Sequence, residues 1–261
     1  MNQEFGVCNL ALVPLRTEPS DRSEMCSQLV FAEVFRILET GEKWTKILTD
    51  YDDYEGWIDN KQFIKINDSA FSDLAKVDEV LGLKVFHQVL RTDTSEKLNL
   101  IAGTLIPPRT DGFFYLGENS YKLLSDAHRP ELLEFGALVE ETARFYLNSP
   151  YLWGGRSVFG IDCSGFTQMV FRQLGIRIKR DAWQQAEQGK LLGFIQEARA
   201  GDLAFFDNEE GRITHVGIML DNNHIIHASG RVRVDPIDTQ GIFNPELNNY
   251  THKLRIVKRF N

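Results

Sequence analysis

The stretch GIDCSGFTQMVFRQLG, residues 160–175, combines a helical pattern with a reactive side chain. Apolar residues recur along it at steps of three and four, which places them on one side of a helix: Phe166, Met169, Val170 and Leu174. Gly175 stands where a glycine commonly ends a helix. The pattern therefore predicts a helix that begins at Cys163, with the thiol in its first turn.

A cysteine at this place is suited to nucleophilic chemistry. The positive end of the helix dipole and the unpaired N–H groups favour the thiolate, which is the nucleophilic form. The same N–H groups can stabilise an oxyanion. Because cysteine is also among the most buried residue types, a purely structural role for Cys163 is the alternative.

Two histidines provide the rest of a catalytic group. His215 opens the predicted strand THVGIML, and His227 lies in the next one, HIIHAS, beyond a hairpin signal at residues 221–223. With a three-residue loop, His227 lies opposite Gly217 and diagonal to His215 on the same face, about 7–8 Å away at Cα. A two-residue loop would place the histidines on opposite faces. We expect Cys163 to attack, His215 to move the proton and His227 to orient His215.

The surrounding chain predicts an α+β catalytic domain over residues 129–261. The run RPELLEFGALVEETARFYLNS predicts a first helix that ends near Asn148, since Pro150 disfavours helix before it. Its apolar stripe consists of Leu132, Phe135, Val139, Ala143 and Tyr146. The predicted antiparallel strands are GDLAFFD, THVGIML, HIIHAS and KLRIVKRF.

Residues 1–128 have a different character. Short apolar runs alternate with turn residues over 1–67, which predicts a small β-barrel. Residues 68–128 predict a short helix or linker and a second, similar barrel.

Composition excludes several classes of function. The net charge of -8 over 261 residues argues against a nucleic-acid binder. No apolar run reaches the roughly 20 residues of a membrane span, and the first residues lack a secretory pattern. We expect a cytoplasmic monomer, or a periplasmic one if an export signal has been removed. The three cysteines form no CxxC pair, so neither a metal nor another cofactor is expected.

Five short segments carry a family resemblance: DCSGF, RDAWQQ, GDLAFF, THVGI and IIHAS. In this order they resemble the NlpC-type papain-like peptidases of bacteria. The resemblance implies a papain-like fold and the triad Cys163, His215 and His227. With VFAE and YEGWI upstream, the whole chain resembles the subgroup that has two bacterial SH3-like barrels. That subgroup cuts murein tripeptides or tetrapeptides with free N-terminal L-Ala between D-Glu and diaminopimelate or Lys, and releases L-Ala-D-Glu.

The resemblance also implies a set of substrate-binding residues. Those matching the ammonium-binding positions are Glu33, Tyr54 and Asp181, and those lining the cleft or flanking the nucleophile are Tyr151, Trp153, Asp162 and Ser164. We expect Arg180 to hold the α-carboxylate of D-Glu. Ala182 stands where family members can carry a hydroxyl, which puts one hydrogen bond to substrate in doubt. From the residues alone, a solvated strand charge is the more frequent role for a residue such as Glu33, and core packing suits Tyr151 and Trp153 equally well.

Two other functions compete with this one. A papain-like fold with Cys and His also serves cell-wall amidases and acyltransferases. A murein-binding protein that has lost catalysis is the second alternative, although the intact Cys163, His215 and His227 argue against it.

Overall fold

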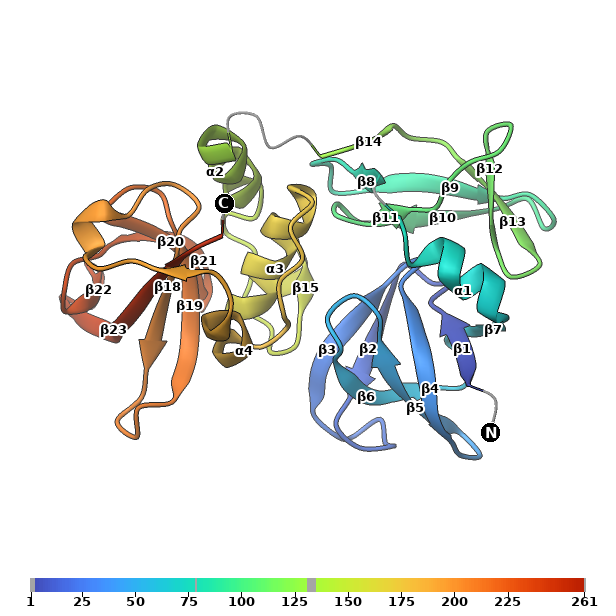
Figure 1. Ribbon diagram of the computed structural model, residues 1–261, viewed down its shortest axis with the longest axis horizontal. Coiled ribbons are helices and arrows are strands. Elements are labelled where there is room, and N and C mark those ends of the chain that lie inside the picture. The colour runs from blue at the N-terminus through green and yellow to red at the C-terminus, as the bar shows by residue number, and fades with distance from the viewer. Residues whose placement is uncertain (1–2, 78, 131–134, 261) are drawn as a thin grey trace. The chain divides into compact units, whose positions relative to one another are not determined.

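The computed structural model describes residues 3–77, 79–130 and 135–260, which form two compact units, Met1–Pro130 and Glu131–Asn261 (Figure 1). No helix among these residues is long and apolar enough to cross a membrane.

The first unit is built from antiparallel sheets. Its largest sheet has the order β3-β2-β6-β5-β4-β1-β7. The strands of this sheet are β1 Glu4–Val7, β2 Leu12–Arg16, β3 Met25–Val30, β4 Val34–Thr40, β5 Trp44–Thr49, β6 Glu55–Asp59 and β7 Ile64–Ile66. Helix α1, Asp68–Leu74, follows. Two smaller sheets contain β8 Glu79–Leu81, β9 His87–Arg91, β10 Glu96–Leu100, β11 Leu105–Ile106, β12 Phe113–Leu116, β13 Asn119–Leu123 and β14 Ala127–His128.

A shared core joins the parts of this unit. Phe31, in the turn after β3, packs edge-to-face on Tyr121 of β13, with ring centroids 5.4 Å apart. Phe5 of β1 stacks on Phe71 of α1. Because these apolar side chains form one continuous cluster, residues before and after 67 are buried together. The division into 1–67 and 68–128 stays a prediction.

The second unit places helices beside one antiparallel sheet. Its sheet has the order β17-β23-β18-β19-β20-β21, and β22 pairs with β23. The strands are β15 Arg156–Ser157, β16 Gly160–Ile161, β17 Lys190–Leu191, β18 Leu203–Asp207, β19 Ile213–Met219, β20 His224–Ser229, β21 Arg231–Pro236, β22 Gly241–Asn244 and β23 Asn249–Arg259. The helices are α2 Phe135–Phe145, α3 Cys163–Gln173, α4 Ala182–Glu187 and the short 3₁₀ helix η1 Ile195–Glu197. This arrangement confirms the α+β prediction.

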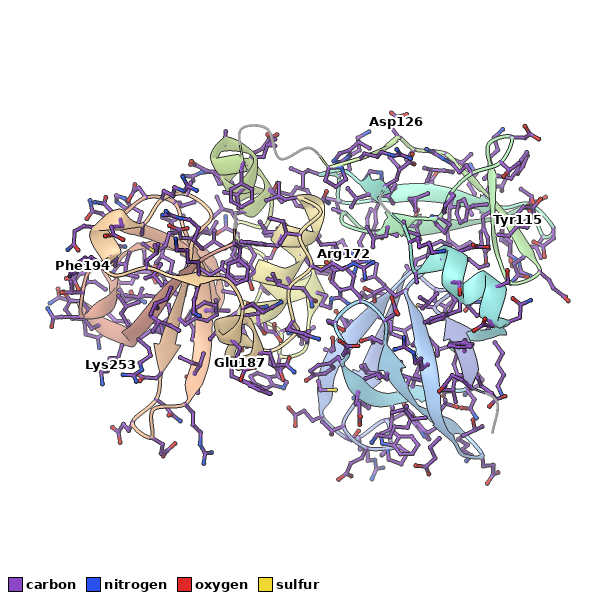
Figure 2. The ribbon with its side chains drawn as sticks, viewed as in Figure 1. Tyr115, Asp126, Arg172, Glu187, Phe194 and Lys253 are labelled. Atoms are coloured by element: carbon purple, nitrogen blue, oxygen red, sulfur yellow. The ribbon has the colours of Figure 1, made fainter. Side chains whose placement is uncertain are left out.

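Helix α3 lies at the centre of this unit. All 11 of its residues are buried, including Arg172, which is marked in Figure 2. Gly165 permits close packing, because a Cβ there would lie 2.4 Å from the carbonyl oxygen of Gly155. The helix predicted over 129–148 is shorter in the structure, since α2 ends at Phe145 and Asn148 adopts a left-handed φ of 65°. Leu132 of its predicted stripe lies outside the described residues.

Candidate active site

The predicted nucleophile is the first residue of α3. Asp162 precedes it as the N-cap and accepts a hydrogen bond from the Gly165 N–H at 2.6 Å. The Cys163 sulfur accepts hydrogen bonds from the backbone N–H groups of Val216 and Ser164. Since Val216 directly follows His215, the thiol lies beside the middle of β19, Ile213–Met219. The structure therefore brings the helix N-terminus and the histidine strand together.

The protonation state of Cys163 differs from the expectation. Burial, and after it the nearby Asp162 carboxylate, raise the pKa of the Cys163 thiol to about 12. The N–H groups of Val216 and Ser164 and the charge of Arg180 lower this pKa only in part. Helix position alone predicted a thiolate, but the loss of water around a buried sulfur is the larger effect. The resting side chain is a neutral thiol.

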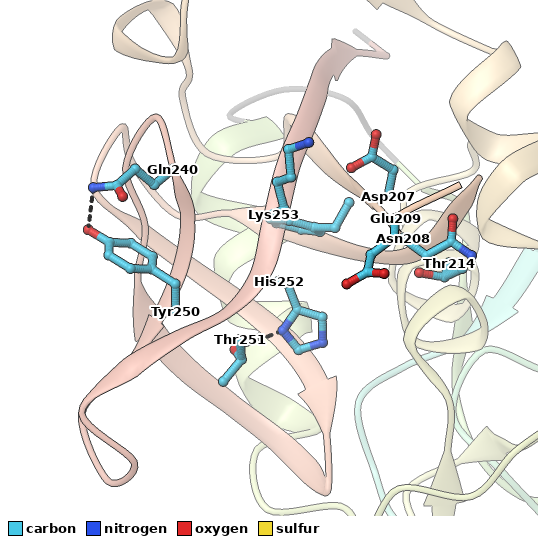
Figure 3. A pocket seen from close by; sticks show the side chains of 10 residues that line it. Asp207, Asn208, Glu209, Thr214, Gln240, Tyr250, Thr251, His252 and Lys253 are labelled. Atoms are coloured by element: carbon cyan, nitrogen blue, oxygen red, sulfur yellow. Dashed lines mark hydrogen bonds between the residues drawn. The ribbon is translucent and has the colours of Figure 1, made fainter. Parts of the chain in front are cut away.

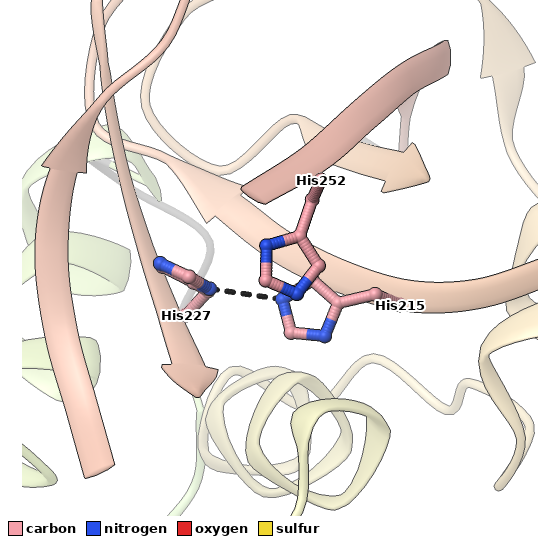
Figure 4. Close-up of side chains that lie close together, drawn as sticks. All are labelled: His215, His227 and His252. Carbon is pink, nitrogen blue, oxygen red and sulfur yellow. Dashed lines mark hydrogen bonds between the residues drawn. The ribbon is translucent and has the colours of Figure 1, made fainter. Parts of the chain in front are cut away.

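The two histidines have the predicted register. The Leu220 N–H donates to the His224 carbonyl, which leaves a three-residue loop, and Gly217 pairs with His227. His215 Nε2 and His227 Nδ1 are 2.9 Å apart in a buried hydrogen bond (Figure 4). The diagonal contact expected from the hairpin signal is confirmed.

The absence of a side chain at residue 217 makes room for this contact. A Cβ on Gly217 would lie 2.8 Å from the His227 Cβ and 2.7 Å from the Ile225 Cδ1. We predict that Gly217→Ala displaces His227, breaks the hydrogen bond with His215 and lowers kcat at least about tenfold. Steady-state kinetics on a murein tripeptide measures the effect, with circular dichroism to show that the fold is kept.

Gly136→Ala is the matched control for this substitution. A Cβ at Gly136, in α2, makes only an ordinary 3.6 Å contact, so activity should stay at the wild-type level. If Gly217→Ala is equally active, the contact between the histidines has no part in catalysis.

A third histidine, His252 of β23, was missed by the sequence analysis. Its ring stacks on that of His215, with centroids 4.1 Å apart (Figure 4). Burial lowers the pKa of His252 to about 4, and the proximity of His227 contributes to this shift. Burial also lowers the pKa of His215 well below its ordinary value, as do His227 and His252. Both rings are therefore neutral near pH 7.

These three histidines raise the question of a metal site. One ring nitrogen from each lies within 4.8 Å of the others. The rings of His215 and His252 are only 27° from parallel, however, and imidazole lone pairs lie in the ring plane. Two such lone pairs cannot converge on one ion about 2 Å from both nitrogens. The observed arrangement fits stacked imidazoles rather than a set of metal ligands.

Asp162, Ser164 and Arg180, predicted to bind substrate, form a buried network of their own. The Arg180 guanidinium donates to Asp162 Oδ2 at 2.6 Å and to the Ser164 hydroxyl at 2.9 Å. The Arg180 side chain is 1% exposed and that of Asp162 is 7% exposed. Asp162 also accepts from the N–H of Gly154 at 2.8 Å. This network holds the loop before α3 in place, and direct contact of these residues with substrate stays a prediction.

The other predicted residues of the second unit surround this network. Tyr151 is half-buried, and its pKa is raised by burial and then by the nearby Cys163 and Asp162. Trp153 is 57% exposed. Asp181 is half-buried at the N-terminus of α4, where its N–H donates to Gln184, and the adjacent Ala182 is buried.

Glu33 and Tyr54 belong to the first unit. Glu33 is buried in the turn between β3 and β4, where its carboxylate accepts the Val30 N–H at 2.8 Å. Tyr54 is half-buried against the core of the large sheet. Their participation in a site with Cys163 stays a prediction.

A cavity of about 620 Å³ adjoins the histidines (Figure 3). His252 forms part of its lining, together with Phe206, which lies against both His215 and His252. Asp207 and Glu209 give it an acidic rim, and Lys253 supplies a positive charge. The lining of this cavity thus carries charges of both signs.

A thiol at a helix N-terminus, beside the strand of an antiparallel sheet that carries a buried histidine, is the arrangement of a papain-like cysteine peptidase. The chain belongs to the NlpC/P60 family, which it matches over residues 148–250. Residues 15–63 match the bacterial dipeptidyl-peptidase Sh3 domain. The protein is thus a cysteine peptidase of the peptidoglycan-directed NlpC/P60 type with an N-terminal SH3 domain.

Similar proteins extend this assignment over most of the chain. A γ-D-glutamyl-L-lysine dipeptidyl-peptidase of Bacillus subtilis is 31% identical over 221 residues, which cover 77% of this chain and 71% of the relative. Dipeptidyl-peptidase 6 of Lysinibacillus sphaericus is 29% identical, over 87% of this chain and 89% of the relative. The crystal structure of an NlpC/P60 family protein from Bacillus cereus shares the fold, with a TM-score of 0.78, 18% identity and coverage of 98% and 99%.

Proposed function

We propose that this chain hydrolyses the bond between D-Glu and diaminopimelate or Lys in murein peptides that begin with free L-Ala. It releases L-Ala-D-Glu in the turnover or recycling of cell-wall peptides. The observation that carries this proposal is the alignment of Cys163, His215 and His227, with the histidines 2.9 Å apart and buried. Two relatives named γ-D-glutamyl-L-lysine dipeptidyl-peptidases support the choice of bond.

Protonation determines the order of the proposed steps. Because Cys163 has a pKa of about 12 and His215 a lowered one, a preformed thiolate–imidazolium pair is disfavoured at rest. The thiol proton passes to His215 as the sulfur attacks the γ-carbonyl of D-Glu. His215 then gives this proton to the departing amine, and water hydrolyses the resulting thioester.

The negative charge on the attacked oxygen needs hydrogen-bond donors. The backbone N–H of Cys163, at the start of α3, provides one direction of support, since Asp162 already accepts the N–H groups of Gly165 and Phe166. The Tyr151 phenol provides another, because its raised pKa keeps it protonated at neutral pH and Cys163 is near enough to contribute to that shift. We propose that both donate to the oxyanion of the tetrahedral intermediate.

Recognition of the free L-Ala amine requires acceptors at one end of the substrate. We propose that Glu33, Tyr54 and Asp181 fill this role. Residues 1–128 would then restrict the enzyme to short free peptides, and a monomer suffices for this purpose.

The decisive experiment uses two peptide pairs, each consisting of a free peptide and its N-acetylated copy. Wild-type protein is incubated with L-Ala-γ-D-Glu-L-Lys, its diaminopimelate counterpart and N-acetylated copies of both, and the products are measured by mass spectrometry. We predict release of L-Ala-D-Glu from the free peptides and a loss of kcat/KM of at least about 100-fold on acetylation, because acetylation removes the positive charge and the hydrogens that the proposed acceptors would bind.

Other outcomes identify the alternatives. Equal cleavage of free and acetylated peptides contradicts the proposed amine recognition and favours an amidase or acyltransferase of the same fold. Retention on intact murein without any hydrolysis favours a catalytically silent binder.

A further inference from the structure

A buried carboxylate that the sequence analysis missed lies behind the two histidines. Asp235 of β21 is 2% exposed, and its Oδ2 is 3.0 Å from His227 Nε2. His227 pairs with Arg233 across β20 and β21, so Asp235 is diagonal to His227, as His215 is on the other side. The row His215, His227 and Asp235 thus crosses three neighbouring strands on one face of the sheet.

Asp235 carries a negative charge near pH 7. Burial by itself raises the pKa of Asp235, but hydrogen bonds from His227 and Arg233 outweigh it and leave the pKa below its ordinary value. Arg233 donates to Asp235 Oδ1 at 2.9 Å and to Glu246 at 3.0 Å. An ionised carboxylate has no hydrogen to give, so Asp235 can only accept.

This restriction fixes the hydrogens along the whole row. Asp235 must receive a hydrogen from His227 Nε2, so a neutral His227 has a free lone pair at Nδ1. His227 Nδ1 then accepts from His215 Nε2, which leaves the lone pair of a neutral His215 at Nδ1. That nitrogen is the one free to take the proton of Cys163.

We propose that Asp235 is a positioning residue that sets the tautomers of His227 and His215 and so makes His215 a competent base. The inference rests on the proposed function for its catalytic meaning, although the tautomers can be measured without substrate. His227 alone is an ambiguous orienting group, because either of its nitrogens can carry the hydrogen. Asp235, on the far side of His227 from His215, removes this ambiguity because it requires the hydrogen of His227 to be on Nε2.

The substitution Asp235→Asn is expected to move the ring hydrogens of His227 and His215 to their other nitrogens, at nearly constant side-chain volume. The guanidinium of Arg233 lies 2.9 Å from Oδ1 and 2.8 Å from Oδ2 of Asp235, so it contacts both ends of an amide at this position. With the amide nitrogen at the Oδ2 position, an N–H donor faces His227 Nε2. A donor there requires a lone pair at His227 Nε2, which moves the hydrogen of His227 to Nδ1 and that of His215 to Nδ1 as well. His215 is then unable to accept the thiol proton.

Two measurements on full-length protein test this proposal. Long-range ¹H–¹⁵N NMR of the histidine rings should give Nε2–H for both His215 and His227 in the wild type and Nδ1–H in Asp235→Asn. With the free tripeptide, kcat should fall at least about 100-fold while KM stays within about threefold, in line with the loss caused by the same exchange behind a catalytic histidine elsewhere.

Asp238→Asn is the matched control. Asp238 is exposed, accepts a hydrogen bond from Tyr250 and lies outside the row, so tautomers and kcat should stay as in the wild type. Wild-type His227 with its hydrogen on Nδ1 would overturn the proposal, even if the Asn variant failed to fold. A fall in kcat without any change of tautomer would also overturn it, because the role would then be structural. If the wild type cleaves no tripeptide, the proposed function fails while the NMR result still decides the role of Asp235.

Discussion

Cys163→Ala is expected to abolish the release of L-Ala-D-Glu, with a loss of at least about 10⁴-fold in kcat/KM. Alanine keeps the helix and removes the only atom of this side chain that can form the thioester. The two histidines and the first-turn N–H groups stay in place, so the variant should still bind substrate. Mass spectrometry of the products and calorimetric titration with the tripeptide measure the two properties separately.

The control for this variant is another cysteine. Cys26 is half-buried in β3 of the first unit, where its thiol donates to the Leu15 carbonyl. Cys26→Ala should therefore cleave at close to the wild-type rate. Turnover by Cys163→Ala at more than about 1% of the wild-type rate would mean that another residue is the nucleophile.

Asp162→Ala is expected to give the largest loss of stability, roughly 3–5 kcal/mol in the free energy of unfolding of the second unit. The substitution leaves the guanidinium of Arg180, which is 1% exposed, without the carboxylate that pairs with it. It also removes the N-cap of α3, a contribution of about 1 kcal/mol. Hydrogen exchange of the α3 amides in increasing urea measures the loss where it arises.

An exposed ion pair provides the comparison. Glu140 and Arg144 lie on the surface of α2 with side chains 41% and 46% exposed, so Glu140→Ala should cost less than about 1 kcal/mol. A loss of less than about 1 kcal/mol for Asp162→Ala would mean that Arg180 binds other acceptors or water in the variant. The buried network would then not be what holds the loop before α3. Cys163 should also become easier to ionise, because Asp162 contributes to its raised pKa.

The placement of His215 and His227 on one face could be predicted because it depends on local geometry. A hairpin with three loop residues determines which side chains share a face, and the signal at residues 221–223 was clear in the sequence. The helix from Cys163 to Gln173 follows from apolar spacing in the same way. Both predictions needed only short-range rules.

The contacts of Asp235 and His252 with the other histidines could not be predicted by such local rules. The strand Arg231–Pro236 does show a signal, because Val232 and Val234 alternate with Arg231, Arg233 and Asp235. The last strand was predicted to begin at Lys253, but β23 begins four residues earlier, at Asn249, and so includes His252. Its contact with His215 depends on the order of strands in the sheet, which no local pattern gives.

Local sequence patterns also could not predict the protonation state of the Cys163 thiol or the ion pair between Arg180 and Asp162. Helix position predicts a lowered thiol pKa, whereas the structure shows that burial raises it. Family likeness implied a role for Arg180 in binding a carboxylate, and the structure supplies one from Asp162. Both depend on how completely neighbouring segments cover a side chain, which is a property of the tertiary packing.

Because the Cys163 thiol is neutral and only 5% exposed, it should resist oxidation by peroxide. Peroxide attacks thiolates that are open to solvent, and the product can pass irreversibly to sulfinic and sulfonic acids. A sulfur that ionises only as the substrate carbonyl is attacked offers little target between turnovers. The same packing that slows ionisation thus protects the nucleophile from chemical damage while the enzyme is idle.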